Sequence, residues 1–211
     1  MLDGLHLEGL PLALPAAQLQ ALEAAHATPP RAYHHFGHVR EVLRHYREVA
    51  DGPGWRRPRE VALAVLYHDA VYVPGRSDNE ERSARLAVSE TARWLGRDAP
   101  DPARVAELIR LTARHGSHAP GDFDGEDADD TRHFLDCDMA ILGAPEAAFD
   151  AYDAAIAEEY RGVVPGWIYR RKRRQFLASL LDRERIFLSD FFHLRLEARA
   201  RANLRRTLSL D

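Results

Sequence analysis

The sequence predicts an all-helical fold, with a helical bundle followed by additional C-terminal helices. Of the 211 residues, 45% are apolar and 29% charged, and the helix-favouring residues Ala, Leu, Glu and Arg are abundant. Apolar side chains recur at three- and four-residue spacing, and glycine or proline repeatedly ends that spacing. We expect one domain over 1–211, with its core at about 31–145 and a helical extension at about 146–211.

Proline and glycine bound the first two helices. The segment 16–27 predicts one helix, which ends before the prolines at 29–30 because proline disfavours helical geometry in the residue before it. From His38 onward, apolar residues return every three or four positions until DGPG at 51–54 breaks the spacing. A second helix is expected over this stretch, after a junction at 31–37.

The third helix differs from the others because it is apolar nearly all round. Residues 61–71 carry almost no polar side chain until the pair His68-Asp69. This pattern is typical of a helix surrounded by other helices. His68 and Asp69 are therefore expected near the end of the most buried helix of the chain.

Capping residues and glycines mark the later helices. Ser77 or Asp78, with Glu80 or Glu81 three residues on, predicts a capping box that opens a helix ending at Gly96. The remaining helices are expected over 101–116, 131–143 and 146–160, and one or two more over 167–187 and 194–208.

Charge and composition exclude several classes of protein. With 33 acidic and 29 basic residues the net charge is −4, so nucleic acid is not an expected partner, and the basic run at 169–175 is interpreted as a solvated helix face. No stretch reaches the ~18 apolar residues of a membrane span, and the N-terminus lacks the positive charge of a signal peptide. The single cysteine, Cys137, is expected to be a packed residue, and it favours a reducing compartment, the cytoplasm.

The pair His68-Asp69 is the first candidate for chemistry. Both side chains can bind a metal ion, and burying them is costly unless a partner such as a divalent cation compensates their polarity. The alternative is that they only cap the helix, with Asp69 accepting backbone N–H groups from the following loop. The pair alone does not decide between these interpretations.

The position of Asp138 favours the metal-binding interpretation. On the helix expected over 131–143, Phe134, Leu135, Ile141 and Leu142 form an apolar stripe with Asp138 in its middle, where a carboxylate is rarely tolerated without a cation. Asp136 is rotated by about 200° from Asp138, at ~100° per residue, and should point away from the core face.

A further histidine must come from the segment HHFGH. His34, His35 and His38 are all available. Projecting the apolar stripe of the second helix backwards puts His35 nearest its centre, but only if the helix already exists there. The residues themselves leave the choice open.

The order of these residues has a known counterpart. The histidine of HHFGH at 38, then His68-Asp69, then Asp138, on successive helices, resembles the H…HD…D signature of the HD superfamily. The segments YHHFGHV, YHDAVYVPGRSDNEERSA, FLDCDMAILGA, EEY and ARANL are similar to the pattern of one bacterial HD subgroup of predicted metal-dependent hydrolases, and they span most of the chain from residue 31 onward. The resemblance implies an HD-domain helical bundle. It aligns His38 with the first metal ligand, whereas His35 occupies a place associated with asparagine.

The resemblance also implies an activity. The ligands would be His38, His68, Asp69 and Asp138, holding a divalent metal ion that activates water for attack on the phosphorus of a nucleotide or another small phosphorylated metabolite. Mixed nitrogen and oxygen ligation suits Mn, Fe, Co, Ni or Mg and leaves Zn open. Specificity lies in pocket-wall residues without a motif, so the substrate and the native metal are not predicted.

Other residues could assist at this site. Asp69 could take the proton from the attacking water, and so could Glu80, unless Glu80 only completes the capping box. For His115 the alternatives are a phosphate contact and an interaction with the helix dipole, and the sequence does not decide between them. The residues that could contact phosphate or support the ligands are His34, His115, Arg31, Arg82, Asn79 and His118.

Two further functions stay open. A dinuclear site that recruits His34 and His115 would perform phosphodiester or oxidative chemistry, and metal stoichiometry would identify it. A non-catalytic nucleotide-binding module would bind nucleotides without turnover. A homodimer is compatible with each of these functions.

Overall fold

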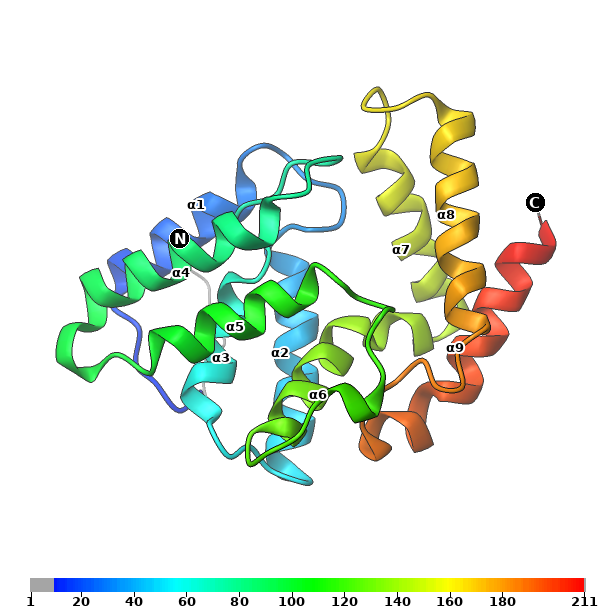
Figure 1. The fold of residues 1–211 in the computed structure, drawn as a ribbon. Coiled ribbons are helices and arrows are strands. Elements are labelled where there is room, and N and C mark those ends of the chain that lie inside the picture. Colours follow the sequence, from blue (N-terminus) through cyan, green and yellow to red (C-terminus); the bar gives the residue numbers. More distant parts are fainter. Residues whose placement is uncertain (1–9, 211) are drawn as a thin grey trace.

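The computed structural model describes residues 10–210, and these residues form helices and no strand, as the sequence predicts (Figure 1). The α-helices are α1 (Ala16–Ala27), α2 (Phe36–Asp51), α3 (Pro58–Tyr67), α4 (Asn79–Leu95), α5 (Pro102–Thr112), α6 (Ala128–Met139), α7 (Glu146–Glu159), α8 (Gly166–Leu181) and α9 (Asp190–Leu210). Three short 3-10 helices are η1 (Gly96–Asp98), η2 (Pro120–Asp122) and η3 (Ala140–Gly143). The N-terminal residues 1–9, considered above for targeting, lie outside the described part.

Helix α3 forms the centre of the core. Every side chain from Val61 to Tyr67 is at most 1% exposed, and α2, α4, α5 and α6 pack around it. The expected all-round burial is confirmed. The helix ends at Tyr67 rather than Val71, and the carbonyls of Asp69 and Ala70 accept hydrogen bonds from Arg31 instead of from helix N–H groups. His68 and Asp69 therefore stand at the exit of the most buried helix.

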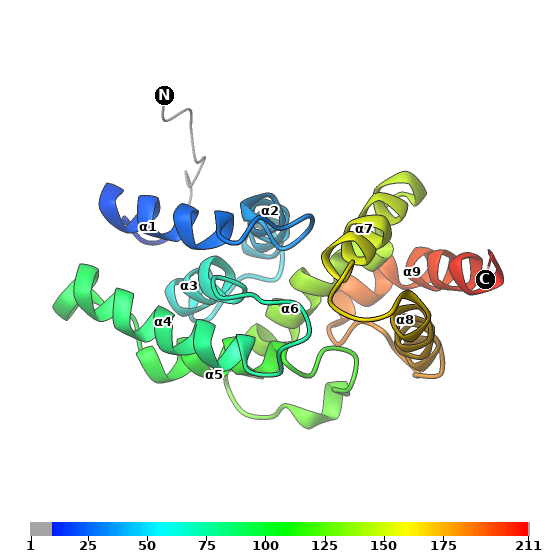
Figure 2. The same cartoon turned by 90° about the horizontal axis from the view of Figure 1, so that it is seen from above.

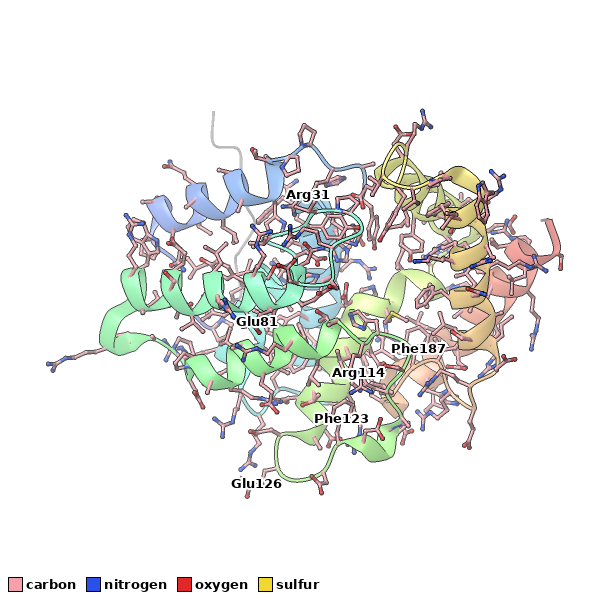
Figure 3. The ribbon with its side chains drawn as sticks, turned by 45° about the horizontal axis from the view of Figure 1, so that its top comes forward. Arg31, Glu81, Arg114, Phe123, Glu126 and Phe187 are labelled. Carbon is pink, nitrogen blue, oxygen red and sulfur yellow. The ribbon has the colours of Figure 1, made fainter. Side chains whose placement is uncertain are left out.

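The predicted capping box before α4 is wrong. Asp78 is the residue before the helix, but its side chain caps no backbone N–H. Both carboxylate oxygens instead accept hydrogen bonds from Arg76, at 2.7 Å each. A guanidinium two residues away thus outcompetes the backbone for this carboxylate. Glu81, labelled in Figure 3, is also engaged elsewhere, since its carboxylate accepts a hydrogen bond from Arg110 on α5.

Helices α7, α8 and α9 form the predicted C-terminal extension. Figure 2 shows them grouped on the opposite side of α6 from α1, α3 and α4. Helix α9 packs closely on η3, where a Cβ added to Gly143 would lie 2.7 Å from the Cβ of Leu196. Asn203 donates to the carbonyls of Leu142 and Ala144 at 2.9 Å, which fixes the same contact from further along α9. The extension is therefore joined to the end of α6 by close packing and hydrogen bonds.

The expectation that Asp136 points away from the core is wrong in one respect. Its carboxylate is on another side of α6 from Asp138, but it is 1% exposed because the segment before α9 covers it. It accepts hydrogen bonds from the N–H groups of Leu188 and Ser189, both at 2.7 Å, and from the Ser189 hydroxyl at 2.6 Å. Burial outweighs these hydrogen bonds and raises the pKa of Asp136 to about 7.

Two smaller predictions concern Cys137 and the basic run. Cys137 is 2% exposed, and burial raises the pKa of its thiol well above the ordinary value, so it is a packed residue as expected. In the basic run the charged side chains face solvent except Arg173, which pairs with Asp153 at 2.7 Å.

Across residues 10–210, no helix combines the length and apolar character needed to cross a membrane.

Candidate metal centre

Three helices bring the four predicted ligands together. His38 lies in the first turn of α2, His68 and Asp69 follow α3, and Asp138 lies near the end of α6. His38 Nε2 and His68 Nε2 are 3.0 Å apart, and Asp69 Oδ2 lies 3.5 Å from the first and 3.1 Å from the second. Ligand atoms of these three residues lie within 4.8 Å of one another. Asp138 Oδ1 lies 2.9 Å from His38 Nε2 and 3.5 Å from His68 Nε2.

The ring of His68 is oriented by its own helix. Its Nδ1 lies 2.8 Å from the carbonyl of Val65, one helical turn earlier, and a carbonyl can only accept a hydrogen bond. Nδ1 therefore carries the proton, and Nε2 directs its lone pair toward His38 and the carboxylates. A backbone carbonyl that fixes the tautomer in this way is the usual support of a metal-binding histidine.

Asp138 connects two histidines. One oxygen faces His38, and the other lies 2.5 Å from Nε2 of His115, which follows α5. His115 thus reaches the site through Asp138 rather than through the two histidines of the cluster. This contact orients the Asp138 carboxylate, so among the roles predicted for His115 it corresponds to support of a ligand.

The pKa values of the four candidate ligands are set by burial and by the opposite charges of their neighbours. Burial opposes ionisation of Asp69 and Asp138, yet the neighbouring histidines hold the pKa of each carboxyl well below its usual range. Burial likewise opposes protonation of His38, but its hydrogen bonds to Asp138 and Asp69 raise its pKa. The same two carboxylates raise the pKa of His68 against the effect of burial. Two charged carboxylates are therefore enclosed together with two imidazoles.

This donor set fits a divalent cation. The side chains of His38 and His68 are 4% and 1% exposed, and those of Asp69 and Asp138 are 14% and 12% exposed. Without a cation, one imidazole must donate to the other or to a carboxylate. A cation of charge +2 would instead balance both carboxylates and accept the lone pairs of both Nε2 atoms.

His34 stands beside this cluster and is held by the C-terminal extension. Its Nδ1 lies 2.6 Å from a carboxylate oxygen of Glu159, the last residue of α7. The other oxygen of Glu159 accepts the backbone N–H groups of Tyr33 and His34 at 2.8 and 2.9 Å. The ring of His34 stacks on Tyr72 at 3.9 Å and contacts His38 edge-on, with the ring centroids 5.8 Å apart. His34 thus has a fixed orientation next to a candidate ligand.

His35 lies outside the cluster, so the backward projection of the helical stripe is wrong. The helix begins at Phe36, and His35 is the capping residue before it. Its Nδ1 accepts the N–H of Gly37 at 2.8 Å, and the side chain is exposed. Because the backbone at His35 is extended, the helical projection does not apply there.

The side chains of Arg31 and Asn79 form hydrogen bonds with backbone groups. The Arg31 guanidinium donates to the carbonyls of Ala25, His34, Asp69 and Ala70 at 2.6 to 3.1 Å (Figure 3). The side chain of Asn79 is 5% exposed, and its amide both accepts from and donates to the backbone of Val73 at 3.0 Å. Of the two roles expected for these residues, the contacts correspond to support of the site, because Arg31 holds the loop that carries Asp69.

Within residues 10–210, no hydrogen bond or ion pair joins the remaining candidates to the cluster. Arg82 is exposed on α4. Glu80 is partly exposed, and within residues 10–210 no hydrogen bond or ion pair engages it. His118 bonds through Nε2 to the carbonyl of Leu111 at 3.2 Å and packs on Phe123, so it supports the loop after α5. Glu80 as a proton acceptor stays a prediction.

Glu159, Tyr33 and Tyr152 lie at the site but were not among the residues predicted for it. Tyr33 packs between His38 and Tyr152, with ring centroids 4.8 and 4.7 Å away. Burial raises the pKa of the Tyr33 hydroxyl well above its ordinary value. The segment EEY contains Glu159 and was the only sequence signal for it, because nothing local links that residue to His34, 125 positions earlier.

A cleft of about 690 Å³ opens beside the cluster. His38, Tyr33 and Asp138 line it together with residues of α2, η3, α7 and α9. Its size is in the range of small-molecule sites, about 300 to 1,000 Å³. The candidate metal centre therefore has an adjoining space in which a ligand could lie.

Comparisons with known proteins add no identification. No family model matches the chain. No curated protein and no solved structure matches it either.

Proposed function

We propose that this chain is a metal-dependent phosphohydrolase of the HD type that acts on a small phosphorylated metabolite. The proposal is carried by one observation. Two imidazole nitrogens and two carboxylates, from three separate helices, converge on one partly enclosed point with distances of 2.9 to 3.5 Å between nitrogens and oxygens. The order of these residues along the chain, which resembles the HD signature, supports the same assignment.

His38, His68, Asp69 and Asp138 would hold the cation. When bound, a divalent cation supplies Lewis acidity toward a phosphoryl oxygen and lowers the pKa of water toward neutrality. Four ligands of mixed nitrogen and oxygen type fit Mn, Fe, Co, Ni, Mg or Zn without selecting one. A single ion per chain is expected, because among the described residues one group brings three possible ligand atoms within 4.8 Å of one another.

The protein's own groups would handle the protons and the substrate. Attack of water on phosphorus breaks the ester P–O bond, and the proton released by the water passes to a carboxylate, Asp69 or Glu80. The organic oxygen leaves as an alcohol after taking up a proton. His34 is fixed through Nδ1 by Glu159, and in the form that carries a proton on both ring nitrogens its Nε2–H would donate to a phosphoryl oxygen.

The test compares two aspartate variants. Asp69→Ala should abolish metal-dependent hydrolysis across a panel of phosphate esters and nucleotides with Mn, Co, Ni and Mg, and it should lower the metal content measured by elemental analysis. Far-UV circular dichroism should show the helices retained. Asp129→Ala is the control, since that carboxylate is 82% exposed and pairs only with the neighbouring Arg132.

Two results would contradict the proposal. Turnover by Asp69→Ala equal to that of the unaltered protein would remove the assigned site. Metal-loaded protein that binds nucleotides yet hydrolyses no member of the panel would favour a non-catalytic binding module.

A further inference from the structure

The cleft beside the metal centre has a chemical character of its own. It lies between α2, η3, α7 and α9, and His38 and Asp138, two of the four proposed ligands, form part of its wall. A phosphate bound at these ligands would therefore place its organic group at the cleft. The chemistry of the remaining wall then indicates which organic group fits.

Much of that wall is small and apolar. Helix α7 contributes Ala148, Ala151 and Ala155, which follow one another at helical spacing on the side that faces the cleft. Ile141 of η3 and Leu196 of α9 also line it. Short side chains on α7 leave the volume open, and none of these five residues offers a side-chain hydrogen bond.

The charged side chains of the wall are already paired with one another. Arg44 donates to Glu41 at 3.2 Å and to Glu48 at 2.5 Å. Glu48 also accepts from Arg195 at 3.0 Å, which closes a network of two acids and two bases.

Among the other polar residues of the wall, Arg199 and His45 are also engaged, and Tyr33, Tyr152 and His35 add aromatic rings that carry polar atoms. Arg199 donates to the carbonyl of Gly143, and His45 pairs with Glu48 at 3.3 Å. The hydroxyls of a sugar, which each need a partner, would compete with these pairs for donors and acceptors. A hydrocarbon would leave them intact.

We propose that the cleft binds the organic group of the substrate and that this group is a hydrocarbon, so that the substrate is an alkyl phosphate monoester. The inference rests on the proposed function, because the phosphate is placed at His38 and Asp138. It goes beyond that function by naming the class of substrate. Burial of apolar surface provides the affinity, and the phosphate anchor fixes the orientation.

The test measures binding without turnover. Alkyl phosphonates, in which a P–C bond replaces the ester, are titrated by calorimetry into the metal-loaded protein, from ethyl to hexyl phosphonate. Burial of one methylene tightens binding about fourfold, so four methylenes should lower the Kd on the order of 200-fold. Ribose 5-phosphate and adenosine 5'-monophosphate serve as polar comparisons and should bind no better than ethyl phosphonate.

Two variants of α7 provide a matched pair. Ala151→Phe fills the cleft, whereas Ala154→Phe places the same side chain on an exposed position outside it. Both alanines are exposed, so neither change disturbs the core. The dependence of Kd on chain length should disappear in Ala151→Phe and persist in Ala154→Phe. Ala148→Phe fills the same cleft from one turn earlier and should act like Ala151→Phe.

The outcomes separate this inference from the proposed function. A Kd that falls with chain length, together with no hydrolysis of any phosphate ester, would support the cleft assignment and overturn the phosphohydrolase. Hydrolysis of small phosphates with a Kd independent of chain length would support the phosphohydrolase and overturn the hydrocarbon assignment. Tightest binding of adenosine 5'-monophosphate or ribose 5-phosphate would overturn it as well.

Discussion

Replacing Glu159 by glutamine tests how strongly the extension is coupled to the site. The Glu159 carboxylate is 2% exposed and accepts three hydrogen bonds, from the Tyr33 N–H, the His34 N–H and His34 Nδ1. Burial opposes its ionisation, but the side chain and backbone of His34 outweigh burial and lower its pKa from 4.5 to about 2. At about 1.4 kcal/mol per pKa unit, the lower pKa corresponds to about 3 kcal/mol of stability.

The sign of this effect sets the pH dependence. Because the folded-state pKa is lowered, the stabilisation is fully present above pH 4.5 and is lost as the pH falls toward 2. At pH 7, Glu159→Gln should lower the free energy of unfolding by about 3 kcal/mol and the Tm by roughly 6 to 12 °C. At pH 3 the difference between the two proteins should shrink to about 1.4 kcal/mol.

Urea denaturation followed by circular dichroism at both pH values measures these differences. Glu158→Gln is the control, because Glu158 is 49% exposed and pairs only with Arg161, and it should change stability by less than about 0.5 kcal/mol. The side-chain amide introduced by Glu159→Gln can donate to Nδ1, which would move the proton of the His34 ring to Nε2, and ¹⁵N chemical shifts report that change. If Glu159→Gln were as stable as Glu158→Gln at pH 7, the carboxylate would not be the support that its contacts indicate.

Three further predictions concern the backbone clamp, the packing of α9 and the metal. Arg31→Ala removes the donors to four backbone carbonyls and should lower the free energy of unfolding by about 3 kcal/mol; an unchanged Tm would contradict the clamp. Gly143→Ala places a Cβ 2.7 Å from that of Leu196 and should cost about 1 to 3 kcal/mol, whereas Gly121→Ala, with nothing within 4 Å, should not. A divalent metal at about 100 times its Kd should stabilise the protein by about 2.7 kcal/mol and raise the Tm by roughly 5 to 11 °C. His68→Ala should show no such rise, and an equal rise in that variant would place the metal elsewhere.

The fold was predictable where a local pattern is decisive. The all-round apolar run from Val61 requires helices on every side, and the structure surrounds it on every side. The absence of a capping hydrogen bond from Asp78 could not be predicted from the sequence. A rule for capping residues does not account for the guanidinium of Arg76, which binds the same carboxylate. Local rules identify the groups that can interact, whereas the tertiary arrangement decides which pairs form.

The candidate site likewise has features that the sequence predicts and features that it does not. A histidine and two acids within apolar stripes are a signal that sequence alone carries, because burial of such groups needs a compensating partner. The sequence left open whether Arg31 contacts phosphate or supports the ligands, because it cannot reveal the backbone carbonyls that converge on its guanidinium. Glu159 is separated from His34 by 125 positions, so only a known fold or coordinates could connect them.

Helix α7 takes part in both proposals, because one end contacts His34 and the other end lines the cleft. Its last residue, Glu159, fixes His34 beside the candidate metal centre, while Ala148 and Ala151 nearer its start form a wall of the cleft. A shift of this helix would therefore alter the orientation of His34 and the width of the cleft together. The hydrolytic chemistry proposed for the core and the substrate choice proposed for the extension would therefore both respond to a shift of α7. Substitutions that fill the cleft should leave the metal affinity unchanged. Substitutions that move α7 should change both the orientation of His34 and the width of the cleft.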